Sequence, residues 1–249
     1  MTMIPPNKEN NFKIVSDELE KISSNFDKEC VILLDADRTL CEIDTSRILN
    51  ELVNINFKEI KGGFLKHGYT YSGFKNMADI YSRLDVLDYI KFSQKTADQV
   101  ELYPGVFKFL KESKKFADLC IVTSGVKRIW ESILQKYSLE HINLIGGTHT
   151  KLDNYIVGRD EKGQIAEFFS QIGLISIAFG DSDVDSLMLK KANHAFVVVN
   201  HRNNADLLPH IKNHSSLYQI SFKDYYHDGI EISNFEKISN LIENLISRG

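Results

Sequence analysis

The sequence lacks any apolar run near the roughly 20 residues that a membrane-spanning helix needs. Its first ten residues have no apolar core, so we expect no secretory signal there. Only three cysteines occur, Cys30, Cys41 and Cys120, and their spacing does not suggest a zinc site. We expect them to be reduced thiols, which is typical of a cytoplasmic protein.

The sequence also lacks a basic excess, an internal repeat and a low-complexity linker. Its formal net charge is -4, which gives no polybasic signature of nucleic-acid binding. Apolar residues make up 43% and charged residues 26% of the 249 positions, as in ordinary folded proteins. This length allows one large domain, or a domain with an inserted module. Oligomeric state cannot be inferred from it.

Apolar strand patterns and helical patterns alternate along the chain. Residues 12–26 carry apolar side chains at steps of three and four, which predicts an amphipathic helix. Residues 31–34 are continuously apolar, as in a parallel strand covered on both faces. Further strands are expected before Thr123 and before Asp181, with helices between. The alternation predicts a doubly wound, Rossmann-like α/β fold with a parallel sheet.

Acidic side chains follow two of the predicted strands directly. Asp35 and Asp37 lie in "VILLDADRTL", and Asp181 and Asp185 lie in "FGDSDVD". Each acid alone is compatible with a turn or a helix N-cap. Together they would meet at the carboxyl edge of a parallel sheet, where such folds bind ligands. A hard cation with oxygen ligands relieves the repulsion, and Mg²⁺ typically takes one or two carboxylates with water and phosphate oxygens.

Groups suited to an anion are expected at the same edge. Thr123, Ser124 and Gly125 follow another strand and offer hydroxyls and close backbone approach at a helix N-terminus. Lys162 lies at the start of a predicted helix at 162–172. A capped turn would explain the Thr-Ser-Gly segment alone, and a solvated surface lysine would explain Lys162 alone. A cation, amide donors and a lysine together indicate a phosphoryl site.

These motifs resemble the haloacid dehalogenase superfamily of phosphohydrolases. "DADRTL", "IVTSG", "EKGQI" and "FGDSDVDSLM" occur in that family's order and rough spacing, over about residues 31–200. Details of the lysine and last acidic motifs are most similar to the phosphoserine phosphatase-like branch. The presence of Asp37 favours phosphate chemistry, because the family's dehalogenases lack an acid two residues after the nucleophile.

The resemblance implies a role for each acid. Asp35 would be the nucleophile that forms an aspartyl-phosphate, and Asp37 the general acid and then the base. Mg²⁺ would be held by the Asp35 carboxylate, the Asp37 backbone carbonyl and Asp181. Asp185 would lie in the outer shell and orient a metal-bound water or Lys162.

The resemblance also assigns the remaining motif residues. Thr123, with Ser124 and Gly125 after it, would hold the phosphoryl oxygens. Lys162 would neutralise charge on the nucleophile and the phosphate. Arg38 is bulkier than the Gly or Ser common at its position and would narrow the entrance.

Residues 44–100 resemble the family's helical cap, inserted after the first strand. The core domain would then comprise residues 1–43 and 101–249. The cap is predicted to be mostly helical, with a break at 61–73. Asp44 and Arg83 are candidates for substrate contact, by their rough positions in phosphoserine phosphatases. Further candidates to face the site are Phe64, Tyr71, Phe74, Met77 and Tyr81, with packing in the core of the cap as the alternative for the apolar residues.

The leading interpretation is a Mg²⁺-dependent phosphomonoesterase acting on a small phosphorylated metabolite, without nucleic-acid or membrane partners. Phosphoserine phosphatase is a narrower alternative. A signalling receiver domain also uses Asp, Thr or Ser, Lys and Mg²⁺, but is about half as long and lacks an early insertion. A non-catalytic protein that keeps the fold would be expected to have lost at least one of the acids.

Overall fold

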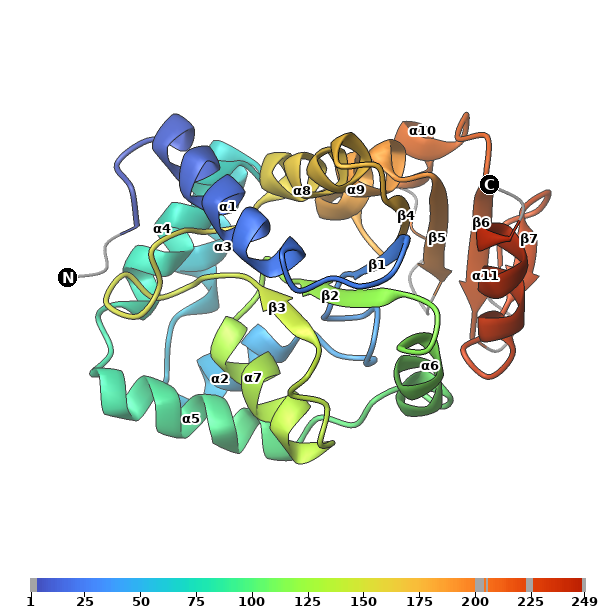
Figure 1. Ribbon diagram of the computed structural model, residues 1–249. Coiled ribbons are helices and arrows are strands. Elements are labelled where there is room, and N and C mark those ends of the chain that lie inside the picture. The colour runs from blue at the N-terminus through green and yellow to red at the C-terminus, as the bar shows by residue number, and fades with distance from the viewer. Residues whose placement is uncertain (1–3, 200–203, 205, 223–225, 248–249) are drawn as a thin grey trace.

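The structure is a computed structural model that describes residues 4–199, 204, 206–222 and 226–247. A seven-stranded sheet with the order β3-β2-β1-β4-β5-β6-β7 forms its centre, and all its ladders are parallel (Figure 1). The strands are β1 (Cys30–Leu34), β2 (Asp118–Val122), β3 (Asn143–Ile145), β4 (Ile175–Gly180), β5 (His194–Val199), β6 (Leu217–Ser221) and β7 (Glu231–Ser233). The strand order reverses between β1 and β4, so the crevice of a doubly wound sheet lies at their carboxyl ends. The predicted fold class is confirmed.

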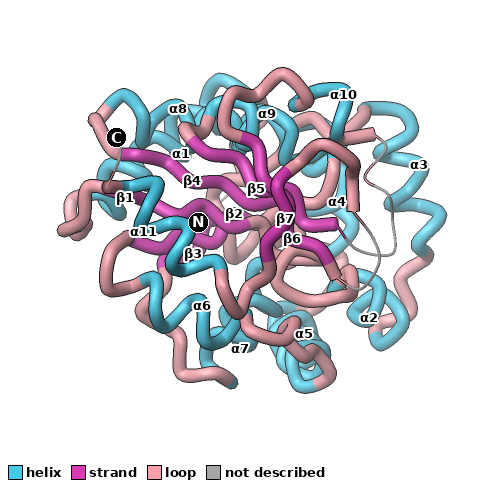
Figure 2. The backbone as a smooth tube through the Cα atoms, turned by 90° about the vertical axis from the view of Figure 1, so that its right-hand side faces the viewer, coloured by secondary structure: helices cyan, strands magenta, loops and turns pink. Residues whose placement is uncertain are grey.

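Helices cover both faces of this sheet (Figure 2). Strand β1 explains why, because Val31 and Leu33 enter one core cluster while Ile32 and Leu34 enter the other. The first cluster packs under α1 (Lys8–Ser23), α8 (Arg159–Gln171) and α9 (Ser186–Lys191), with α10 (Leu208–Ile211) beside α9. The second packs under α6 (Val106–Ser113), α7 (Lys127–Lys136) and α11 (Ile238–Ile246).

Four helices fill the chain between β1 and α6. They are α2 (Thr45–Leu52), α3 (Phe57–His67), α4 (Tyr71–Tyr81) and α5 (Val86–Asp98). The chain leaves and re-enters the sheet region through two adjacent segments, where Cys41 pairs with Leu102 in an antiparallel bridge. Helix α5 packs on α7, and α3 packs on α4. The helical insertion is therefore where the sequence predicts it, while 44–100 as an independent domain stays a prediction.

The predicted helix break within 61–73 is present but shorter than expected, because α3 continues through Gly62 and Gly63 and the chain turns only at 68–70. Gly63 serves close helix packing instead of ending the helix, whereas a Cβ on Gly62 would meet nothing within 4 Å. A Cβ on Gly63 would lie 2.1 Å from Asn76 Oδ1 of α4, and one on Gly73 would lie 2.2 Å from the Gly68 carbonyl oxygen.

Other differences from the sequence analysis are smaller. Helix α8 begins at Arg159, so Lys162 lies in its first turn instead of opening it. The segment between β3 and α8 forms a loop. Neither β7 nor α10 was expected. Cys30, Cys41 and Cys120 are buried, free thiols. Within the described ranges, no helix has both the length and the apolar character needed to cross a membrane.

Helix α1 is tied to the start of α8 by one buried side chain. Asn11 Nδ2 donates to the Ile156 carbonyl oxygen at 3.0 Å and to Glu161 Oε1 at 3.2 Å, and Asn11 Oδ1 accepts from Ile156 N at 3.0 Å. Asn11 has no exposed surface. All its bonds cross between segments far apart in sequence, so its removal would leave several buried polar groups unpaired.

We predict that Asn11→Ala lowers the free energy of unfolding by about 3 kcal/mol, because Ile156 and Glu161 lose their buried partners. Chemical denaturation would measure it. The control is Asn10→Ala on the same helix, whose side chain is exposed and whose loss should change stability by less than about 0.5 kcal/mol. Equal effects of the two substitutions would contradict the proposed buried tie.

Candidate active site

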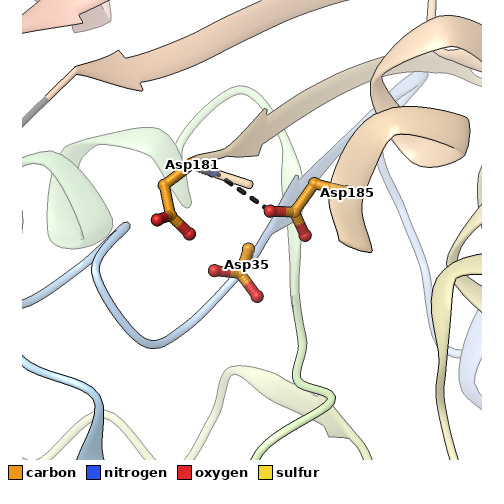
Figure 3. Close-up of side chains that lie close together, drawn as sticks. All are labelled: Asp35, Asp181 and Asp185. Carbon is orange, nitrogen blue, oxygen red and sulfur yellow. Dashed lines mark hydrogen bonds between the residues drawn. The ribbon is translucent and has the colours of Figure 1, made fainter. Parts of the chain in front are cut away.

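The carboxyl ends of β1 and β4 bring three acids together. Asp35 follows Leu34, the last residue of β1, and its backbone N donates to the Phe179 carbonyl oxygen of β4 at 2.9 Å. Asp181 follows Gly180, the last residue of β4. One carboxylate oxygen each of Asp35, Asp181 and Asp185 lies within 4.8 Å of the others (Figure 3). The sequence prediction that these strand ends converge is thus met in the geometry.

Lys162 lies between two of these acids. Its Nζ donates to Asp35 Oδ1 at 2.5 Å and to Asp185 Oδ1 at 2.6 Å, and its side chain has no exposed surface. Burial alone would lower the pKa of Lys162. The charges and hydrogen bonds of Asp185 and Asp35 together raise that pKa above its ordinary value, so the side chain is a buried cation.

Asp185 uses both of its oxygens on protein groups. Oδ1 accepts from Lys162, and Oδ2 accepts from the backbone N of Asp181 and of Ser182, both at 3.1 Å. The close turn depends on Gly180, because a Cβ there would lie 2.4 Å from the Cβ of Asp185. Asp185 therefore fixes the backbone that carries Asp181 and also positions Lys162.

Asp181 retains one buried oxygen without a protein partner. Its Oδ2 lies 3.1 Å from Arg38 Nε, while Oδ1 is buried and accepts no hydrogen bond from any residue that the structure describes. Burial raises the pKa of Asp181 well above its usual value, and Arg38 only partly opposes this. An unpaired buried carboxylate oxygen beside two more acids fits a cation bound by hard oxygen donors. The residues present thus fit Mg²⁺.

Asp35 is held by two donors from different segments. Besides Lys162 at Oδ1, Thr39 Oγ1 donates to its Oδ2 at 3.0 Å. Burial and the charge of Asp185 raise the pKa of Asp35, whereas Lys162 lowers it. The net effect is a raised pKa for Asp35, with the Lys162 cation held against one oxygen of its carboxyl group.

Asp37 lies in a separate hydrogen-bond environment. Its Oδ1 accepts from Trp130 Nε1 at 2.8 Å and from Thr45 Oγ1 at 2.9 Å. Burial, followed by the charge of Asp44, raises the pKa of Asp37 to about 7. Such a group exists in both protonation states near neutral pH, which suits a general acid and base.

Trp130 and Thr45 were missed by the sequence analysis. Trp130 lies in the first half of α7, the helix that begins just after Thr123–Gly125, and Thr45 directly follows Asp44. Proximity in sequence to predicted site residues was the only signal for either. Asn204 was missed too; its side-chain amide donates to the Asp181 carbonyl oxygen.

Thr123, Ser124 and Gly125 line the same cavity as Asp35 and Asp37. Thr123 Oγ1 accepts from Gly125 N at 3.0 Å. Ser124 Oγ is buried without a hydrogen-bond partner among the described residues. A Cβ on Gly125 would lie 3.0 Å from Asp37 Oδ2, so glycine keeps this backbone close to the acid. The α7 N-terminus begins two residues later and favours an anion here.

The cavity has a volume of about 460 Å³ and extends from these motifs to α2, α3 and α4. Four of the cap residues expected to face the site do line it: Asp44, Phe64, Phe74 and Met77. Tyr71 and Tyr81 do not, because their hydroxyls donate to the Pro5 carbonyl oxygen and to Asn50 Oδ1 inside the protein.

Arg83 is not placed at the site. It follows the end of α4, its side chain is 63% exposed, and its Nη1 pairs with Glu59 Oε1 at 2.7 Å. Arg47 of α2 and Lys61 of α3 are instead the cap cations that line the cavity, together with Arg38 from the first motif. The sequence position of Arg83 near a family contact thus did not predict where its side chain points.

Solved structures of similar fold support this architecture. A phosphoserine phosphatase determined as a phospho-aspartyl intermediate analogue has a TM-score of 0.57 and 18% identity, over 86% of this chain and 99% of that one. A haloacid dehalogenase family hydrolase from Salmonella enterica serovar Typhi gives 0.59 and 14%, over 97% and 84%. A gene product of Archaeoglobus fulgidus gives 0.61 and 12%, over 88% and 83%. At these identities the likeness concerns the fold.

No curated protein matches the chain. Residues 32–190, which include all four motifs and the cap, match the family model of haloacid dehalogenase-like hydrolases. The match covers well over half of the chain and confirms the resemblance that the motifs indicated. The chain belongs to the haloacid dehalogenase-like hydrolase family.

Proposed function

We propose that this protein is a Mg²⁺-dependent phosphomonoesterase that hydrolyses a small phosphorylated metabolite through an aspartyl-phosphate. The observation that carries the proposal is the separation of two acids in one cavity. Asp35 is held against the Lys162 cation, and Asp37 is held by neutral donors and has a raised pKa. Two carboxyl groups in unlike environments suit a nucleophile and a general acid.

Asp35 attacks the phosphorus in the first step. The new bond joins a carboxylate oxygen to phosphorus while the bond to the alcohol oxygen breaks. Lys162 and Thr39 fix the carboxylate and draw charge from it before attack. Ser124 Oγ lines the same cavity and has no hydrogen-bond partner among the described residues, so it can donate to a phosphoryl oxygen.

Asp37 transfers the proton in both steps. Protonated, it gives its proton to the departing alcohol oxygen. Ionised, it takes a proton from the water that attacks the aspartyl-phosphate, which releases phosphate and regenerates Asp35. Trp130 and Thr45 hold the carboxyl group in place, and Thr45 Oγ1 also lies 3.1 Å from its second oxygen.

Mg²⁺ would be held by the carboxylates of Asp35 and Asp181 and by the backbone carbonyl of Asp37. When bound it would neutralise negative charge on the phosphoryl group and the nucleophile. Asp181 Oδ1 supports this assignment because it is the oxygen left without a partner. Asp185 would act from the outer shell, since both its oxygens already accept from Lys162 and the backbone.

Hydrolysis of p-nitrophenyl phosphate tests this function against its alternatives. We expect turnover that requires Mg²⁺, stops with chelator and returns when Mg²⁺ is restored. A non-catalytic protein would release no phosphate, and a signalling protein would accept one phosphoryl group without turnover. Full activity in a rigorously metal-free sample would rule out the site as described.

We predict that Asp181→Asn weakens Mg²⁺ binding by more than about 10-fold, because the substitution removes a charged ligand from the cluster. Titration calorimetry on the unmutated and mutated proteins would measure the affinity. The matched control is Asp183→Asn two residues away, whose carboxylate pairs with Arg159 instead of entering the cluster. Similar losses for both variants would mean that general charge, and not ligation by Asp181, sets the affinity.

Substitutions of Asp35 and Asp37 should stop different steps. Asp35→Ala removes the nucleophile, so we expect no phosphoenzyme from any substrate. Asp37→Asn cannot transfer protons, and general acid help is worth roughly 10²–10⁴-fold for a poor leaving group. The first step should therefore suffer more with an alkyl phosphate than with p-nitrophenyl phosphate, whose phenolate leaves readily.

Asp37→Asn should also trap the intermediate. With p-nitrophenyl phosphate we expect a burst of about one phenolate per site, then slow turnover, because water still needs a base. Rapid-quench kinetics and intact mass would detect phosphate on Asp35. A covalent adduct in Asp35→Ala, or wild-type rates with both substrates in Asp37→Asn, would refute the assigned roles.

A further inference from the structure

Where helices α3 and α4 line the cavity, its surface is apolar and largely aromatic apart from Lys61 of α3. Helices α3 and α4 and the turn between them contribute this cap wall, which consists of Phe57, Ile60, Phe64, Tyr69, Phe74 and Met77. Phe64 lies at the centre, with its ring centroid 4.9 Å from that of Phe74 and 5.3 Å from that of Tyr69. The rings therefore form one continuous patch facing the reaction centre.

Two rings of the cap wall are only partly covered by the protein. Phe57 is 48% and Tyr69 44% exposed, although both line the cavity. Apolar surface left in contact with water inside a concave site is stabilised by any ligand that covers it. The protein thus offers binding energy to a flat apolar group that reaches the cap wall from the phosphoryl site.

The polar groups of the cap suit a small zwitterion less well than the cap wall suits a flat apolar group. Asp44 Oδ1 already accepts from Ser46 N at 3.2 Å and Ser46 Oγ at 2.5 Å, as the N-cap of α2. Arg83 points away from the site and pairs with Glu59. Among the described residues, Asp44 is the one cap carboxylate in the lining, and the cap cations Arg47 and Lys61 line the cavity as well. The ammonium of an amino-acid phosphate would therefore meet like charges and an apolar wall, which cost free energy.

We propose that the preferred substrate is a phosphate monoester whose alcohol carries a flat apolar body of about the size of an aromatic ring. The body lies on the cap wall while the phosphoryl group lies at Asp35 and Ser124. The inference rests on the proposed phosphatase function and names its substrate class.

Three alkyl phosphates with similar leaving groups test it: 2-phenylethyl phosphate, ethyl phosphate and O-phosphoserine. Similar leaving groups keep the chemistry nearly constant, so kcat/KM reports how the body binds in the transition state. We expect kcat/KM for 2-phenylethyl phosphate to exceed that for ethyl phosphate by at least about 10-fold, from burial of the ring. It should exceed the value for O-phosphoserine too. A preference for O-phosphoserine, or a ratio near one between the first two substrates, would overturn the proposal.

Variants of the partly exposed rings locate the preference. We expect Phe57→Ala and Tyr69→Ala to lower the ratio of kcat/KM for 2-phenylethyl over ethyl phosphate by several-fold each. The matched control is Leu65→Ala on the same helix as Phe57, because Leu65 is 79% exposed and does not line the cavity. An unchanged ratio in both ring variants, or an equal fall in the control, would contradict the cap wall as the binding surface.

A binding measurement separates this inference from the proposed function. The Asp35→Asn protein is titrated with 2-phenylethyl phosphate and ethyl phosphate in a calorimeter, at a Mg²⁺ concentration raised until binding no longer changes, because Asp35 is itself a proposed Mg²⁺ ligand. If the wild type hydrolyses neither these nor p-nitrophenyl phosphate, the proposed function fails, and this titration still judges the cap wall. Binding of 2-phenylethyl phosphate at least about 10-fold tighter supports the inference, and equal or undetectable binding of both refutes it.

Discussion

The buried ammonium of Lys162 is the interaction on which the site depends. A buried cation costs several kcal/mol unless it is fully paired, so both Asp35 and Asp185 must approach it. Asp35 comes from the end of β1, Asp185 from the turn after β4, and Lys162 from α8. Because β1 and β4 are neighbours in the sheet, the ion pairs of one lysine can join the ends of both strands to helix α8. Asp35, the proposed nucleophile, is thereby oriented by the same contact that stabilises the core around it.

A helix outside the residues that match the family model also helps to hold Lys162 in position. Helix α1 precedes residue 32, yet its Asn11 bonds to Glu161, the residue before the lysine. Gln164 of α8 donates in turn to the Phe12 carbonyl oxygen and to Ser16 Oγ of α1. These contacts hold the first turn of α8 against α1, so the N-terminal helix contributes to the site by fixing the backbone of Lys162 while touching none of the reacting groups.

The sequence predicted the core site well and the cap site poorly, for a physical reason. A continuous apolar run followed by an acid places that acid at a strand end, and parallel strand ends share one edge. A helix pattern specifies only a buried face, and α4 buries two surfaces at once. Phe74 and Met77 face the cavity, whereas Tyr71 and Tyr81, at the same three- and four-residue spacing, pack inside. Gly63 shows a related ambiguity, since close helix packing and helix breaking both favour glycine.

In the proposed function, chemistry belongs to the sheet edge and substrate selection to the helical insertion. Charged groups that must keep fixed geometry are buried and paired from the sheet edge and α8, where neighbouring elements hold them rigidly. The cap wall needs only shape and apolar surface, which tolerate small shifts because dispersion and burial are not directional. The cap is joined to the sheet region at Cys41 and Leu102, and Arg159 N of α8 donates to the Tyr69 carbonyl oxygen at 3.2 Å. That bond links the turn carrying an exposed ring directly to the helix of Lys162, so a group bound on the cap wall as proposed would be positioned relative to Asp35.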